Sequence, residues 1–272
     1  MTNENSESFA SVTSSMSLRP LILGHRGASA VAPENTLAAF SRAMSDGADG
    51  IEFDVRLARD RIPVVIHDAT LKRTGLIQRA VSELTAKELQ QIDVGGWFAR
   101  RTRSASSSIA EKLPLLEQVC ELFRENDGFL YIEMKCDKND GPVLAEAVVR
   151  LARDSGLAER VVIESFDLPA IAAVKKIDAG IRTAALFEPK LSQPISSVRR
   201  LRMINTACDV GADEIALHHS LASARAIDKA SQAGLEIVVW TVADPAWIGI
   251  ARSLGIKALI TNDPASLVHH RR

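Results

Sequence analysis

Cysteine is scarce in this chain of 272 residues, which has only Cys120, Cys136 and Cys208. The three are scattered, their number is odd, and no two of them form a Cys-x-x-Cys pair. This pattern argues against a disulfide framework and against a zinc site. We therefore expect a protein of the reducing cytoplasm.

A basic excess is also missing, since 33 Lys and Arg residues face 34 Asp and Glu residues for a net charge of -1. Nucleic acid is therefore not an expected partner, and any phosphate must be recognised by a few well-placed cations. Aromatic residues make up only 4% of the chain. That low content argues against stable docking on a membrane.

The apolar stretches are short, and none approaches the roughly 18 to 20 residues that cross a bilayer. Residues 1–19 are polar and Ser-rich, so we expect a disordered segment without a secretory signal or anchor. The hydrophobic content of 46% is enough for one large core. Residues 20–272 are accordingly predicted to form a single catalytic domain.

Strand-like and helix-like segments alternate along the chain. Apolar runs predict strands at 21–24, 51–55, 62–66, 129–134, 161–166, 182–187, 214–217, 236–242 and 257–261. Amphipathic stretches predict helices at 37–46, 115–125, 142–154, 168–178, 222–233 and 245–254. This order predicts an α/β fold with a parallel sheet, and its size is that of a (β/α)8 TIM barrel. A flat, doubly wound sheet is the alternative.

Nine strands are one too many for such a barrel. Only four residues separate Leu57 from Ile62, far too few for a parallel crossover. The run at 62–66 is therefore predicted to form an antiparallel hairpin with the strand before it. If Leu57 pairs with Ile62, Glu52 lies opposite His67 on the same face of the sheet.

Three carboxylates are expected to point into the barrel. Alternation along their strands places Glu52 and Asp54 on one face, and it places Glu133 and Lys135 on the interior face of another strand. Carboxylates enclosed together repel one another unless a proton or a divalent ion neutralises them, and oxygen ligands favour Mg²⁺, Ca²⁺ or Mn²⁺ over zinc. One such cation is the predicted cofactor. Inward salt bridges to Arg26 and Lys135 are the alternative.

Other polar residues at the strand ends suit a phosphate diester. His25 and His67 are the predicted acid and base, because histidine exchanges protons near neutral pH. Arg26 can make bidentate contacts to a phosphate, and Lys135 can supply a point charge. Trp240 is a candidate for packing on the carbon atoms of a substrate, with a purely structural role as the alternative.

The segment Pro33-Glu34-Asn35-Thr36 opens the first predicted helix. Asn35 or Thr36 is the predicted N-cap, and free N–H groups at that helix end favour an anion. Glu34 and Asn35 are therefore included among the candidate substrate-binding residues.

In combination, these motifs resemble the glycerophosphodiester phosphodiesterase family over roughly residues 20 to 264. The segments that carry the resemblance are His25-Arg26-Gly27, Pro33-Glu34-Asn35-Thr36, Glu52-Phe53-Asp54, His67-Asp68, Glu133-Met134-Lys135 and Trp240-Thr241-Val242. The resemblance implies a distorted TIM barrel that hydrolyses glycerophosphodiesters to sn-glycerol 3-phosphate and an alcohol. It also implies metal ligands at Glu52, Asp54 and Glu133, an acid–base pair at His25 and His67, and phosphate binding by Arg26 and Lys135.

Residues 69–112 are similar to the insertion that this family carries after its His-Asp motif, and they are expected to cap the substrate entrance. The chain departs from the family in a basic and Ser-rich loop at 100–108, which we interpret as solvated rather than as a site for the alcohol. It departs again at Thr261-Asn262-Asp263-Pro264, where the family more often shows Thr-Asp-x-Pro.

The expected reaction places the cation on a phosphate oxygen, with the glycerol 2-hydroxyl as a second candidate ligand. One histidine deprotonates the nucleophile, either water or that hydroxyl, and the other protonates the leaving alcohol.

Two alternative functions stay open. One is a lysophospholipase D or phospholipase C-like enzyme acting on lipids, and the other is an inactive barrel that binds a metabolite. Retention of all the charged motif positions weighs against the inactive barrel. The sequence leaves open a monomer or a homodimer.

Overall fold

The computed structural model describes residues 19–102, 110–137, 139–189 and 196–271, so the predicted disordered segment at 1–19 lies almost wholly outside the described residues. Eight parallel strands close into a barrel there, because β1 pairs with both β2 and β9. They are β1 (Leu21–His25), β2 (Gly50–Leu57), β4 (Phe129–Met134), β5 (Val161–Ser165), β6 (Arg182–Phe187), β7 (Glu214–His218), β8 (Glu236–Trp240) and β9 (Ala258–Thr261). The predicted TIM barrel is confirmed, and the flat doubly wound sheet is wrong.

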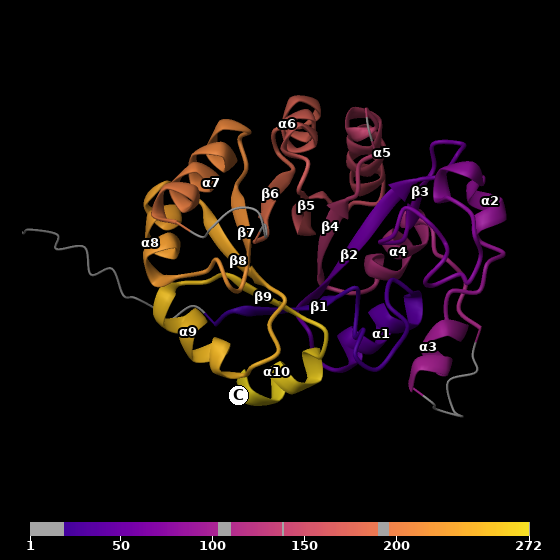
Figure 1. Cartoon of the computed structure of the whole chain (residues 1–272), viewed down its shortest axis with the longest axis horizontal. Coiled ribbons are helices and arrows are strands. Elements are labelled where there is room, and N and C mark those ends of the chain that lie inside the picture. Colours follow the sequence, from indigo (N-terminus) through magenta and orange to yellow (C-terminus); the bar gives the residue numbers. More distant parts are fainter. Residues whose placement is uncertain (1–18, 103–109, 138, 190–195, 272) are drawn as a thin grey trace, which may run out of the picture.

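Helices surround this barrel (Figure 1). They are α1 (Leu37–Ser45), α4 (Leu116–Arg124), α5 (Gly141–Asp154), α6 (Leu168–Ile177), α7 (Ser197–Asp209), α8 (Ala224–Gln232), α9 (Ala246–Leu254) and α10 (Pro264–Arg271). The six predicted helices lie within about two residues of their expected bounds. Helices α7 and α10 were not predicted. In the described ranges, no helix combines the length and the apolar character of a bilayer-crossing segment.

The hairpin strand β3 (Pro63–Val65) runs antiparallel to β2, as predicted, but its register differs by one residue. Leu57 pairs with Pro63, not with Ile62. The reason is the turn, in which the Ala58 amide donates to the Ile62 carbonyl at 3.0 Å and Arg61 adopts a φ of 65°. The predicted pairing of Glu52 with His67 is therefore wrong. His67 still reaches the barrel mouth, because the chain leaves the sheet after Val65 and strand alternation no longer directs it.

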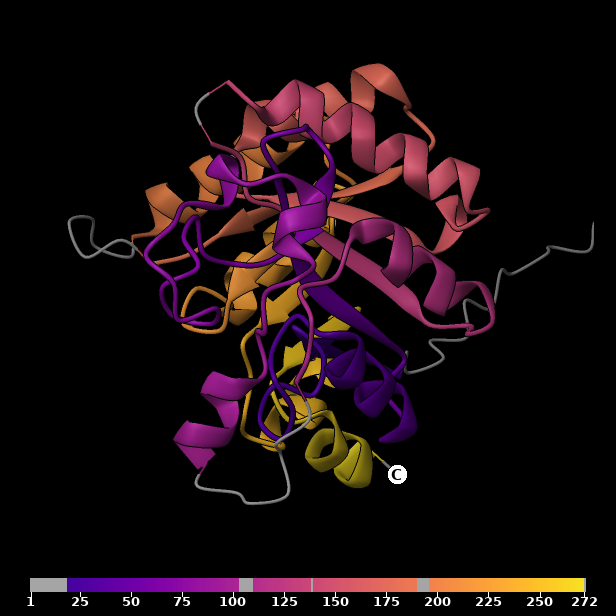
Figure 2. The same cartoon turned by 90° about the vertical axis from the view of Figure 1, so that its right-hand side faces the viewer.

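The chain between β3 and α4 forms an insertion at one side of the barrel, beyond β3 (Figures 1 and 2). It contains the short helices η1 (Val81–Glu83), α2 (Ala86–Leu89) and α3 (Gly96–Thr102). Leu71, Leu89 and Leu113 pack with Val64 in a small apolar cluster of its own. Most of the loop expected at 100–108 lies outside the described residues.

The barrel interior changes character along the strands. Outward side chains such as Phe53 and Ile132 pack against the helices, as alternation predicted. Leu23, Tyr131 and Val238 fill the middle of the barrel. The inward positions nearer the carboxyl ends of β2, β4 and β5 carry carboxylates. A short 3-10 helix, η2 (Ala158–Arg160), precedes β5. The apolar floor therefore supports a charged mouth at the end where TIM barrels carry their sites.

Candidate active site

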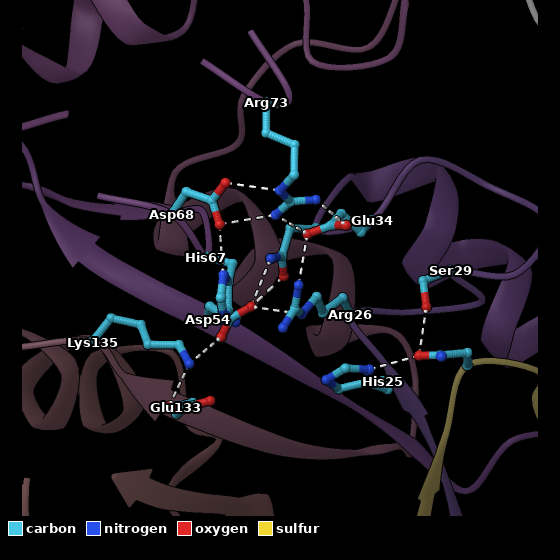
Figure 3. Close-up of polar contacts among 12 residues, drawn as sticks. His25, Arg26, Ser29, Glu34, Asp54, His67, Asp68, Arg73, Glu133 and Lys135 are labelled. Carbon is cyan, nitrogen blue, oxygen red and sulfur yellow. Dashed lines mark hydrogen bonds and ion pairs between the residues drawn. The ribbon is translucent and has the colours of Figure 1, made fainter. Parts of the chain in front are cut away.

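A cavity of about 540 Å³ opens at this charged mouth. Among its lining residues are seven predicted from the sequence, namely His25, Arg26, Glu52, His67, Glu133, Lys135 and Trp240. Asp54 is buried beside them, where it contacts Arg26 and Lys135 (Figure 3). Glu34 instead lines a neighbouring hollow of about 510 Å³, and the buried Asn35 lies behind Asp54. All ten predicted site residues therefore lie at or next to one mouth of the barrel.

Glu52, Asp54 and Glu133 form an acidic cluster in which each residue offers one oxygen within 4.8 Å of the others. Asp54 and Glu133 are directly paired across β2 and β4. Lys135 Nζ lies 3.2 Å from Asp54 Oδ1 and 2.6 Å from Glu133 Oε1. Neither of these two buried oxygens receives a well-directed hydrogen bond from the described residues. The cluster thus presents free carboxylate lone pairs, which suit a hard divalent cation.

The charges in this cluster do not balance by themselves. Burial raises the pKa of Glu133 to about 8, together with repulsion from Asp54. Burial and the same repulsion raise the pKa of Glu52. Burial acts in the same direction on Asp54, but Arg26 and Lys135 outweigh it and lower the pKa of that carboxyl. Two cations therefore keep one carboxylate ionised, and the other two need a proton or a metal ion.

Arg26 sits in a sharp turn directly after β1. Its backbone takes a φ of 54°, and its amide donates to the Glu52 carbonyl at 2.7 Å. A side chain at Gly27 is excluded, because a Cβ there would lie 2.5 Å from the Ala39 carbonyl carbon. The turn aims the guanidinium inward, with Nε 3.1 Å from Asp54 Oδ2. The segment His25-Arg26-Gly27 thus contributes a tight backbone turn as well as functional side chains.

Asn35 and Thr36 have separate tasks at the start of α1. Thr36 is the N-cap, since its side chain accepts a hydrogen bond from the Ala39 amide at 3.2 Å. Asn35, with a φ of 58°, donates from Nδ2 to Asp54 Oδ2 at 2.8 Å. Of the two predicted caps, Thr36 is right and Asn35 is wrong. Asn35 instead holds Asp54 in place.

His25 faces a neutral partner. Its Nδ1 lies 2.6 Å from Asn262 Oδ1, which also accepts a hydrogen bond from Ser29 at 3.1 Å (Figure 3). Because an amide oxygen can only accept, the ring proton belongs on Nδ1, and Nε2 is left 3.8 Å from Glu52 Oε2. Burial and the charge of Arg26 lower the pKa of His25 to about 4. His25 is therefore a neutral imidazole with a free Nε2.

His67 faces an ionic partner. Its Nδ1 lies 2.7 Å from Asp68 Oδ1, and Asp68 accepts hydrogen bonds from Arg73 at 2.7 and 3.0 Å. Arg73 also donates to both oxygens of Glu34, at 2.6 and 2.9 Å, and Arg26 donates to Glu34 at 2.8 Å. Hydrogen bonds to Arg73 hold the pKa of Asp68 at about 2. A continuous charged chain therefore joins His67 to Arg26 through the insertion (Figure 3).

Four residues of the site were not predicted. No sequence pattern pointed to a role for Arg73 or Asn262, although Asn262 lies in the segment that departs from the Thr-Asp-x-Pro motif of the family. Asp68 was noted in the His-Asp motif without a function. Glu164 lines the main cavity and is paired with Glu133 across β4 and β5. Alternation along 161–166 already placed Glu164 on the interior face, so this residue could have been found.

Aromatic side chains form the remaining walls. Trp240 packs edge-on against Phe166 with ring centroids 5.6 Å apart, and its indole Nε1 donates to the Ala216 carbonyl at 3.3 Å. Trp97 and Phe98 from α3 line the neighbouring hollow together with His25. The insertion therefore contributes one side of the mouth, while its predicted capping role stays a prediction.

Comparisons with known proteins identify the family that the chain resembles. Residues 25–266 match the model of the glycerophosphoryl diester phosphodiesterase family. The chain is 30% identical over 254 residues to a glycerophosphodiester phosphodiesterase of Caldanaerobacter subterraneus subsp. tengcongensis, covering 93% of this chain and 98% of that relative. It is similar to the structure of a glycerophosphodiester phosphodiesterase of Agrobacterium tumefaciens, with a TM-score of 0.73, 27% identity and coverage of 92% and 99% of the two chains.

A second structure shares the fold at lower identity. It is an Oleispira antarctica phosphodiesterase in complex with the product sn-glycerol-3-phosphate, with a TM-score of 0.78, 24% identity and coverage of 92% of this chain and 96% of that one.

Proposed function

The chain belongs to the glycerophosphoryl diester phosphodiesterase family, and on this basis we propose that it uses a divalent cation, His25 and His67 to release sn-glycerol 3-phosphate and an alcohol. The observation that carries the proposal is the acidic cluster. Glu52 and Glu133 line one cavity with His25 and His67, and the buried Asp54 meets these two carboxylates within 4.8 Å. A binding-only barrel has no use for such an arrangement.

Glu52, Asp54 and Glu133 would hold the cation, with Mg²⁺ or Ca²⁺ as the first choices and Mn²⁺ as a third. When bound, the cation neutralises charge on a phosphate oxygen and lowers the pKa of the attacking hydroxyl. Arg26 and Lys135 line the same cavity and supply the positive charges for the remaining phosphate oxygens.

The two histidines differ in the partner behind each ring. The Nδ1 of His25 is hydrogen-bonded to the Asn262 amide oxygen, and its Nε2 is free, which suits His25 to accept the proton of the nucleophile. Burial lowers the pKa of His67, but the hydrogen bond to Asp68 opposes this shift, which suits His67 better than His25 to donate a proton to the leaving alcohol. The nucleophile is water or the glycerol 2-hydroxyl. This assignment makes His25 the base and His67 the acid.

The test is release of glycerol 3-phosphate from glycerophosphocholine and glycerophosphoethanolamine, with and without a chelator. We expect His67→Ala and Glu52→Gln each to lower turnover by about two or more orders of magnitude, the size expected for an acid–base or metal function. A chelator should abolish the activity of the wild type.

Glu236→Gln is the matched control for Glu52→Gln, because Glu236 begins β8 at the opposite end of the barrel and its side chain is 48% exposed. It should keep near-normal turnover. Chelator-resistant turnover would contradict the metal, and absence of turnover with every divalent metal would contradict the proposed substrates.

A further inference from the structure

Glu164 is a buried carboxyl group that the proposed reaction does not use. It is 1% exposed, lies in β5 beside Glu133 of β4, and lines the main cavity. Its Oε2 is buried and has no hydrogen-bond partner among the described residues. An unsatisfied buried oxygen of this kind is costly, so a partner is expected from the ligand.

The surroundings of Glu164 select the kind of partner. The acidic cluster whose oxygens meet within 4.8 Å consists of Glu52, Asp54 and Glu133, which leaves Glu164 beside the predicted metal position rather than in it. The ion pairs of Lys135 run to Asp54 and Glu133. A second anionic group would be repelled by these carboxylates. A hydroxyl fits, because it can accept from a protonated carboxyl or donate to an ionised one.

The cavity around Glu164 also suits a short carbon chain. Phe166, Leu186 and Trp240 line it and offer apolar contact to carbon atoms. Glu164 and Glu133 stand on adjacent strands, about 4.8 Å apart in a typical sheet. A ligand with one hydroxyl at the acidic cluster can therefore bring a hydroxyl on its next carbon to Glu164. Glycerol carries such a pair of neighbouring hydroxyls.

A second hollow adjoins the main cavity. It is lined by Trp97, Phe98 and Arg101 of the insertion, together with His25, which also lines the main cavity. The insertion therefore borders the second hollow, whereas Glu164 lies in the main cavity.

We infer that Glu164 binds the C1 hydroxyl of the glycerol half of the substrate and so selects glycerol over alcohols that lack this hydroxyl. The inference rests on the proposed function, since it places the glycerol 2-hydroxyl beside Glu52, Asp54 and Glu133. Glu164 is a specificity-determining residue in this role. It fixes the direction in which the diester lies across the metal position.

The test compares glycerophosphocholine with propane-1,2-diol phosphocholine, which lacks the C1 hydroxyl. We expect wild-type kcat/KM to favour glycerophosphocholine by about tenfold to a hundredfold, the size expected for one hydrogen bond to a carboxylate. In Glu164→Leu the preference should fall to within about twofold, because the leucine leaves no group to pair with the hydroxyl. Glu164→Gln should keep part of it.

Glu214→Gln is the matched control. Glu214 is another buried carboxylate of the barrel interior, but it is held by Tyr131, Arg182 and Lys257, so its loss should leave the substrate preference unchanged. Thermal unfolding checks that each variant is folded.

Three outcomes would overturn the inference while leaving the proposed function intact. The first is an unchanged preference in Glu164→Leu, and the second is an equal loss on both substrates. The third is a rise of about tenfold in the Mg²⁺ concentration for half-maximal activity, which would make Glu164 a metal ligand. A wild type that turns over neither substrate would instead refute the proposed function.

Discussion

His25 and His67 illustrate how one residue type receives two chemical characters in one cavity. An amide oxygen of Asn262 stands behind His25, and a carboxylate of Asp68 stands behind His67. Burial lowers the pKa of both rings, and the hydrogen bond from each ring to its partner opposes that shift. A carboxylate stabilises an imidazolium more than a neutral amide does, so the two partners make the histidines differ.

Replacing Asn262 by Asp tests this directly. A carboxylate 2.6 Å from His25 Nδ1 would favour the charged ring and raise the pKa of His25 above its present value of about 4. The limb of the kcat/KM profile that reports His25 should move to higher pH. The measurement is that profile between pH 4 and 9 with saturating Mg²⁺. Asn262→Ser, which adds no charge, is the control, and an unmoved profile in Asn262→Asp would count against a protonic role for His25.

At the scale of elements, the insertion is fastened to the barrel by Arg73. This side chain bonds both Asp68 and Glu34, and its guanidinium lies 5.7 Å from the centroid of the Trp97 ring. Glu34 is in turn bonded by Arg26, which follows β1. Arg73 therefore holds Asp68 behind His67, the proposed acid, and the insertion also forms one wall of the mouth.

Arg73→Ala should lower kcat/KM by about tenfold or more, because Asp68 loses the partner that orients it behind His67. Arg79→Ala is the control, since Arg79 pairs only locally with Glu83 in the same insertion. Steady-state kinetics and limited proteolysis of the insertion are the measurements. Equal kcat/KM and equal rates of proteolysis in Arg73→Ala and Arg79→Ala would contradict the role of Arg73 in holding the insertion to the barrel.

The effect of Arg73→Ala on the free energy of unfolding should depend on pH. Because the folded pKa of Asp68 is depressed to about 2, its pairing with Arg73 stabilises the fold above the unfolded pKa and is lost as the pH falls through about 2. Urea unfolding at pH 7 and at pH 2 should therefore show a stability gap between wild type and Arg73→Ala only at pH 7.

For the molecule as a whole, the acidic cluster is a source of instability that the proposed cation would relieve. Glu133 has a folded pKa of about 8 against an ordinary 4.5, so the metal-free fold loses stability as the pH rises through that window and the carboxyl must ionise. A cation that binds only the folded state stabilises it in proportion to its affinity and concentration. Folding and metal binding are thus coupled.

Thermal unfolding with and without Mg²⁺ or Ca²⁺ checks this coupling. The wild type should gain several degrees in Tm, since a ligand at a hundred times its Kd adds about 2.7 kcal/mol. The gain should be larger at pH 8 than at pH 5. Glu133→Gln should raise the Tm of the metal-free protein and remove most of the gain. A metal effect that survives in Glu133→Gln would place the cation elsewhere.

Local patterns in the sequence predicted much of this architecture. Period-two alternation alone assigned Glu52, Asp54 and Glu133 to the interior, because side chains of a strand must alternate between its faces. The short link between Leu57 and Ile62 was enough to predict the hairpin, since four residues cannot span a parallel crossover. Helix α7 escaped prediction because its arginine-rich first turns, Arg199 to Arg202, obscure the apolar period.

Contacts between distant segments were decided only by the tertiary structure. Asn262 meets His25 across 237 residues because β1 and β9 are neighbours in the closed barrel, and Arg73 meets Glu34 because the insertion lies against one side of the mouth. The left-handed Arg61 shifted the hairpin register by one residue, a choice that depends on turn geometry and not on hydrophobic pattern. The sequence by itself thus determined which side chains face inward. Closure of the barrel decided which of them meet, because local periodicity carries no information about partners far along the chain.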